Sequence, residues 1–171
     1  GGASYSLFGY TGAADAETVF VAIGAGAVVV SEAVKKAGAK VGVVHVNLYR
    51  PWAHQQFLDT IPTTARRIVV LERAEDPTST GEPLYLDVLS TVSSSLPAHW
   101  ASSSSPAVVG GTYGLGTEDF TPASVLQIID AAASSRRIPR RFSVNALAAS
   151  NAADSPAAAT AISAAPSLDA S

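Results

Sequence analysis

Residues 68–87 read IVVLERAEDPTSTGEPLYLD, and the rest of the chain is arranged around this stretch. The apolar run Ile68–Leu71 is mostly β-branched and is followed by turn residues, which predicts a fully buried strand. Four charges come next within five positions, and Pro77 and Gly81 then break the chain. Pro83 opens a helix, because the N–H that proline lacks needs no partner in the first turn. A buried strand, a polar loop and a helix in this order predict an open parallel sheet that binds ligands or partner domains at this loop.

The remainder of the chain alternates between apolar strand patterns and helical patterns. Further strands are predicted at residues 19–23, 41–48, 106–109 and 142–144. Helices are predicted at residues 27–37, 54–59, 84–96 and 123–133. Because the joints between these elements are short, right-handed crossovers and a mostly parallel sheet follow. Residues 93–105 are rich in serine and are interpreted as an unstructured joint between a helix and a strand.

These patterns divide the chain into three parts. Residues 1–13 are rich in glycine and serine and are interpreted as a linker. Residues 14–145 contain the predicted strands and helices and are expected to form one α/β domain. Residues 146–171 are an alanine- and serine-rich run, interpreted as a disordered tail or linker because such small side chains bury too little apolar surface to form a core.

Composition excludes several classes of function. The formal net charge is -3 and charged residues make up 15% of the chain, so no basic surface for nucleic acid is expected. No apolar run is long enough to cross a bilayer, and no signal-peptide pattern is present. The chain has no cysteine, which excludes disulfides and thiolate metal sites. We expect a soluble intracellular segment of a longer protein, because without methionine Gly1 is not an unprocessed start; cytoplasm, chloroplast and mitochondrion all stay open.

The polar loop that follows the central strand is the first candidate site. Its charged residues Glu72, Arg73, Glu75 and Asp76 lie at the carboxyl end of that strand. Carboxylates in this position could hold Mg²⁺ or act as acid and base. A solvated loop that pairs with a neighbouring domain explains the same charges, and we favour this interface interpretation, since charged clusters are only statistically associated with catalysis.

A glycine-rich segment, GGTYGLG at residues 110–116, is the second candidate site. Gly110, Gly111 and Gly114 allow another backbone to approach closely, which suits a loop that cradles phosphate. The lysine that ends a phosphate-binding loop is absent, and two acidic residues follow at positions 118 and 119. We therefore favour a tight loop that carries Tyr113 into an interface between domains or subunits.

Three further features have open or structural interpretations. Arg50 follows a predicted strand, where it could bind an anion or pair with Glu72 or Glu75; these alternatives stay open. The three histidines are not spaced as metal ligands. Gly24-Ala25-Gly26 is a partial dinucleotide fingerprint, but a valine stands where the third glycine belongs, so a plain strand-to-helix turn is favoured.

Several of these motifs resemble one enzyme family in their order and spacing. VLER at residues 70–73 and GEPLYLDV at residues 81–88 resemble core domain II of the pyruvate:ferredoxin oxidoreductases. Three further motifs resemble the same domain: YRP at residues 49–51, VGGTYGLG at residues 109–116 and DFTP at residues 119–122. The resemblance covers residues 10–144. That domain is a transketolase C-terminal-like unit, so the resemblance implies a three-layer α/β/α fold with a mostly parallel five-stranded sheet and one antiparallel edge strand.

The resemblance also implies a function for the whole enzyme, namely oxidative decarboxylation of pyruvate to acetyl-CoA by a homodimer. Thiamine diphosphate, iron–sulfur clusters and coenzyme A are its implied cofactors, and ferredoxin or flavodoxin is its implied acceptor. The resemblance places the catalytic and cofactor-binding residues in other domains. This segment is therefore expected to bind no cofactor alone and to be inactive by itself.

The role that the resemblance leaves to this segment is to support the thiamine diphosphate domain and the domain or dimer interface. The candidate interface residues are Arg50, Glu72, Arg73, Glu75, Gly110, Gly111, Tyr113 and Gly114. Two alternatives stay open: a scaffold or binding domain at the N-terminal side of a sulfite reductase flavoprotein, and a detached interaction domain.

Overall fold

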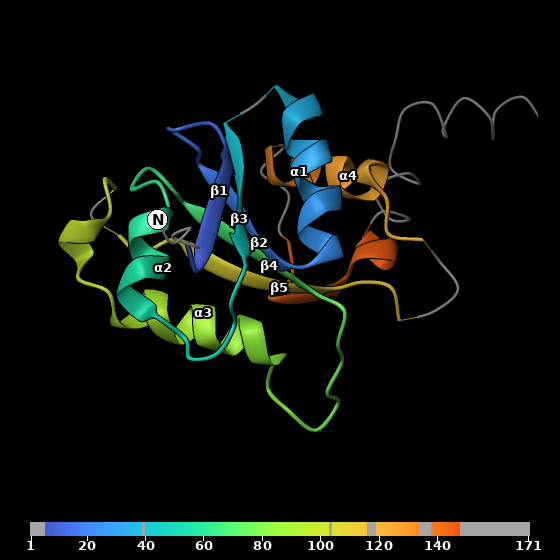
Figure 1. The fold of residues 1–171 in the computed structure, drawn as a ribbon. Coiled ribbons are helices and arrows are strands. Elements are labelled where there is room, and N and C mark those ends of the chain that lie inside the picture. The colour runs from blue at the N-terminus through green and yellow to red at the C-terminus, as the bar shows by residue number, and fades with distance from the viewer. Residues whose placement is uncertain (1–5, 39, 103, 116–118, 134–137, 148–171) are drawn as a thin grey trace, which may run out of the picture.

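The computed structural model describes residues 6–38, 40–102, 104–115, 119–133 and 138–147. They form a three-layer α/β/α domain around a six-stranded mixed sheet with strand order β1-β3-β2-β4-β5-β6 (Figure 1). The strands are β1 (Phe8–Gly12), β2 (Thr18–Ile23), β3 (Val41–Val46), β4 (Arg67–Glu72), β5 (Ala107–Thr112) and β6 (Arg141–Ser143). The helices are α1 (Ala25–Ala37), α2 (His54–Thr60), α3 (Pro83–Ser94), η1 (Pro97–His99) and α4 (Pro122–Ala133). The predicted α/β class, with a mostly parallel sheet and one antiparallel edge strand, is confirmed.

The sheet separates two hydrophobic cores. Successive residues of β2 alternate between them: Val19 and Val21 face the core under α2 and α3, whereas Phe20 and Ala22 face the core under α1 and α4. This alternation follows from the two-residue period of a strand. Helices therefore cover both faces of the central strands, which explains why β2 and β4 read as continuous apolar runs.

The number of strands is the main correction to the predicted fold. The sheet has six strands and not five, because β1 lies within residues 1–13, for which the composition predicts a linker. β1 pairs antiparallel with β3 and forms one edge of the sheet. Its aromatic residues supply the reason: Phe8 is buried against Trp52 and Phe57, with ring centroids 5.2 and 5.4 Å apart. At the opposite edge, β6 pairs parallel with β5.

The serine-rich segment 93–105 is more ordered than its composition indicates. Its first two residues complete α3, and η1 follows. Trp100 is only 2% exposed, and its Nε1 donates a hydrogen bond to the hydroxyl of Ser95 over 2.9 Å. One large side chain thus supplies the apolar surface that the surrounding serines lack. Most of the predicted tail, residues 148–171, lies outside the described residues.

His45 links β3 to α1 and gives the domain a pH-dependent contribution to its stability. Its Nε2 lies 2.8 Å from the hydroxyl of Ser31, and burial together with Lys35 lowers the pKa of His45. The unfolded chain, with a histidine pKa of about 6.5, therefore binds more protons than the folded chain at acidic pH. The contribution of neutral His45 to the stability of the folded chain is therefore complete above about pH 6.5 and is lost as the pH falls below that value.

The variant His45→Gln tests this pH dependence. We expect the stability advantage of the wild-type chain over the variant to shrink as the pH is lowered from about 8 to about 5, as measured by urea unfolding. An advantage that stays constant over this range would contradict the assignment.

Candidate functional site

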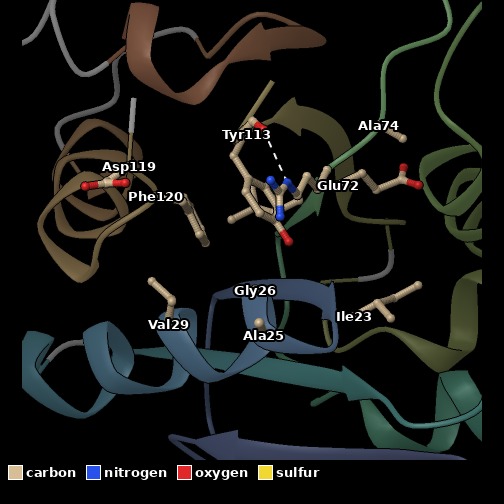
Figure 2. Close-up of a pocket in the computed structure, with 12 residues that line it drawn as sticks. Ile23, Ala25, Gly26, Val29, Glu72, Ala74, Tyr113, Asp119 and Phe120 are labelled. Atoms are coloured by element: carbon tan, nitrogen blue, oxygen red, sulfur yellow. Dashed lines mark hydrogen bonds between the residues drawn. The ribbon is translucent and has the colours of Figure 1, made fainter. Parts of the chain in front are cut away.

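The candidate site is a cleft at the sheet edge where the parallel strands end. Ala22, Leu71 and Gly111 are aligned across β2, β4 and β5, so the loops that follow these strands emerge side by side. They enclose a cleft of about 640 Å³, shown in Figure 2. This edge is the one at which the strand–loop–helix pattern predicts binding. The residues that line the cleft are Ile23, Ala25, Gly26, Val29, Leu71, Glu72, Arg73, Ala74, Tyr113, Gly114, Asp119 and Phe120.

Glu72 anchors the start of α3. Its two carboxylate oxygens accept hydrogen bonds from the backbone N–H groups of Leu84 and Tyr85, over 2.9 and 2.8 Å. The N-cap residue itself, Glu82, caps no N–H with its side chain, so Glu72 takes over that task from a neighbouring strand. Burial raises the pKa of Glu72, although these two hydrogen bonds favour its charged form. Both oxygens are thus used within the domain, which opposes a role as a magnesium ligand.

Arg73 is held at the cleft by a turn. Its Nε donates to the carbonyl oxygen of Gly114 over 3.2 Å, and Gly114 has a φ of 64°, which favours glycine. The neighbouring charges lie elsewhere: Glu75 is exposed and outside the cleft. Asp76 accepts hydrogen bonds from the hydroxyl and the backbone N–H of Thr78, which lower the pKa of its carboxyl group. The predicted group of four charges is therefore dispersed.

Gly110 and Gly111 belong to β5 and not to the predicted loop. Both are buried, so these two interface candidates do not reach the surface. A Cβ on Gly110 would lie 3.0 Å from the ring of Tyr85, and one on Gly111 would lie 2.6 Å from the ring of Phe142. Tyr85 on α3 and Phe142 on the neighbouring strand β6 therefore need the space that these glycines leave, and local sequence does not reveal such a contact.

Tyr113 forms a wall of the cleft. Its ring stacks on Phe120, with centroids 4.0 Å apart and planes inclined by 23°. Its hydroxyl lies against the first turn of α1, where a Cβ on Gly26 would be 2.0 Å away. Gly26 therefore makes room for this tyrosine, which supports the interpretation of Gly24-Ala25-Gly26 as a plain turn. Burial raises the pKa of Tyr113, so the phenol stays protonated at neutral pH.

Arg50 lies apart from the cleft and pairs with α3. Its Nη1 donates to a carboxylate oxygen of Asp87 over 2.7 Å, and the Tyr49 hydroxyl donates to the same oxygen over 2.7 Å. The suggested pairing of Arg50 with Glu72 or Glu75 is therefore wrong. Sequence reasoning misses Asp87 as the partner, because the sequence does not show which turn of α3 faces the loop after β3.

Sequence reasoning also misses the apolar side of the cleft. Figure 2 shows Val29 and Phe120 on the walls that face its centre, and Asp119 at the end away from Glu72. In the sequence, Val29 is noted only because it stands where the dinucleotide fingerprint would have its third glycine. Phe120 is noted only as part of the DFTP motif. Val29 lies on α1 and Phe120 lies just before α4, and the packing of these two helices brings both residues to the cleft. A local sequence pattern carries no signal for this arrangement.

The described residues contain no group of three or more histidines, aspartates or glutamates arranged to hold a metal ion. Within the same ranges, none of the helices has the length and apolar character that a membrane-spanning helix needs. The fold and the cleft thus define a three-layer α/β domain with an open binding edge at the carboxyl ends of its parallel strands.

The comparisons with known proteins name its family. Residues 16–125 match the family model described as pyruvate:ferredoxin oxidoreductase core domain II, and the chain belongs to this family. It is 44% identical over 146 residues to the mitochondrial pyruvate dehydrogenase [NADP(+)] of Euglena gracilis, covering 84% of this chain and 8% of that protein. It is 42% identical over 132 residues to the pyruvate:ferredoxin oxidoreductase of Moorella thermoacetica, covering 75% of this chain and 11% of that protein.

A solved structure gives a weaker likeness. The 2-oxoglutarate:ferredoxin oxidoreductase from Magnetococcus marinus, with 2-oxoglutarate, coenzyme A and succinyl-CoA bound, is 18% identical with a TM-score of 0.49. The match covers 74% of this chain and 19% of that one. In each of these three comparisons, this chain spans a small part of the length of the other protein.

Proposed function

We propose that this domain serves as a structural part of a 2-oxoacid oxidoreductase that decarboxylates pyruvate oxidatively to acetyl-CoA. In this proposal it supports the thiamine diphosphate domain and forms part of the interfaces between domains and within a homodimer. Ferredoxin or flavodoxin receives the electrons, in line with the names of the Moorella thermoacetica relative and of a pyruvate-flavodoxin oxidoreductase from Trichormus variabilis. The name of the Euglena gracilis relative gives NADP(+) instead. Family membership and identities of 44% and 42% to such enzymes support this assignment.

The apolar carboxyl edge of the sheet is the observation that carries the interface role. Among the described residues, most of the large hydrophobic side chains that are exposed lie at this edge: Ile23, Val28, Leu48 and Leu115. Val28 is 66% exposed and Leu115 is 49% exposed. Exposed apolar side chains that gather on one edge are typical of a surface that another protein surface covers. Arg73 and Tyr113 at the same edge belong to the predicted interface set.

The cofactors implied by the resemblance do not fit this domain. Iron–sulfur clusters need thiolate ligands, and the chain has no cysteine. A diphosphate needs several donors or cations, whereas the cleft contains one arginine together with the carboxylates of Glu72 and Asp119. We therefore assign to the domain a role through its surface, and we assign the chemistry to the rest of the enzyme.

A chimera tests the proposed function. The matching domain of the Moorella thermoacetica enzyme is replaced by this chain, and pyruvate-dependent ferredoxin reduction is measured with coenzyme A present. We expect the chimera to turn over, whereas an enzyme lacking the domain and this chain alone show no pyruvate oxidation. A chimera that assembles like its parent but reduces no ferredoxin would contradict the proposal, as would turnover by the chain alone.

A further inference from the structure

We propose that the cleft at the carboxyl edge is the docking site for a segment of a neighbouring domain of the same enzyme. The segment presents an apolar side chain next to a carboxylate, and the carboxylate pairs with Arg73. This inference rests on the proposed function and adds the position and chemistry of the contact.

Arg73 provides the charge that selects a carboxylate. Its side chain is fixed by the Nε bond to Gly114, and its two terminal amino groups have no hydrogen-bond or ion-pair acceptor in the described part of the chain. Glu72, the adjacent carboxylate, is bound to the start of α3 instead. A positioned guanidinium with free donors suits a planar carboxylate, which it binds through two parallel hydrogen bonds.

The walls of the cleft provide the apolar half of the site. Val29 on α1 and Phe120 opposite it face the space between the loops, and Ile23 closes one end (Figure 2). Tyr113 is held in place by its stacking on Phe120 and by the space that Gly26 leaves, so the wall is preformed. A cleft of about 640 Å³ has room for several side chains of a short segment.

The rim of the cleft distinguishes a protein segment from a free small molecule. Ile23 lines the cleft and is exposed, and the exposed residues Val28 and Leu115 directly adjoin the lining residues Val29 and Gly114 in the sequence. A small carboxylate in the cleft would leave Val28 and Leu115 in water. A neighbouring domain would cover all three. The relatives have room for such a domain, because this chain covers only 8% of the Euglena gracilis protein and 11% of the Moorella thermoacetica protein.

Hydrogen exchange tests the docking site in the active chimera described above. We expect backbone amides of residues 24–29 and 113–115 to exchange at least about tenfold more slowly in the chimera than in this chain alone, because the docked segment covers them. The charge reversal Arg73→Glu is expected to abolish this protection. The matched control Arg66→Glu, just before the opposite end of β4, is expected to leave it intact.

A photo-crosslinker at position 28 of the chimera identifies the occupant. We expect a crosslink to another domain of the same polypeptide, in a peptide that contains aspartate or glutamate. Equal exchange rates in an active chimera and the isolated chain would overturn the docking site while the proposed function stands. Slower exchange in the isolated chain with pyruvate or coenzyme A, or a crosslink between two copies of the domain through position 28, would overturn the proposed occupant.

Discussion

Replacing Glu72 with alanine is expected to lower the free energy of unfolding by about 3 kcal/mol, because two partly buried N–H groups lose a charged acceptor at once. The N–H groups of Leu84 and Tyr85 point at this carboxylate, and the N-cap side chain of α3 does not replace it. Glu72→Gln keeps one acceptor oxygen and is expected to lose about half as much. Urea unfolding monitored by circular dichroism measures both changes.

The matched control for this prediction is Glu75→Ala. Glu75 carries the same charge a few residues away, but it is exposed and lies outside the cleft. Its replacement is expected to change the stability by less than about 0.5 kcal/mol. Equal losses for the two variants would show that charge in the loop, and not capping of α3, is the property that stabilises the domain.

Arg141→Ala is expected to lower the free energy of unfolding by about 2 kcal/mol, because it leaves a buried carboxylate without its ion-pair partner. Its Nη2 donates to Oε1 of Glu82, a residue whose side chain is only 2% exposed. Such a loss costs about 3–5 kcal/mol in a fully buried pair. The expected loss is smaller here because Arg141 is itself 38% exposed, so water can reach the carboxylate once the arginine is gone.

A double-mutant cycle separates this effect from a general loss of packing. In Glu82→Gln the carboxylate is replaced by a neutral amide, so adding Arg141→Ala to that variant is expected to cost clearly less than it does in the wild-type chain. Thermal or urea unfolding of the four proteins gives the coupling. If the arginine substitution costs the same in both backgrounds, the ion pair is not the stabilising interaction.

The hydrogen bonds of Glu72 and the ion pair between Glu82 and Arg141 both lie at the start of α3. Together they join three separate parts of the chain. Glu72 ends β4, Glu82 precedes α3, and Arg141 begins β6. The start of α3 is therefore held by one carboxylate from the sheet and connected to the edge strand by another. This anchoring fixes the loop of residues 73–81 at both ends and so helps to position Arg73 at the cleft.

Elements that depend on local chemistry could be predicted from the residues alone. The apolar run before Glu72 predicts β4, because its length and its β-branched residues suit a buried strand, and Pro83 marks the start of α3. Gly38 ends α1 in the left-handed conformation, and a glycine directly after a helical pattern likewise predicts the end of a helix. The order of strands and helices then predicts the α/β class and the edge where binding is expected.

The use of each residue at that edge depends on packing between distant segments. Glu72, Gly110 and Gly111 look like site residues, yet Glu72 caps α3 and the two glycines make room for aromatic rings. The sequence does not reveal these roles, because the partners of these residues lie in other elements of the fold. Val29 and Phe120 carry no signal, yet they line the cleft, because α1 and α4 pack side by side. A local pattern specifies the conformation of its own segment, whereas a site is made by side chains that only the packed fold brings together.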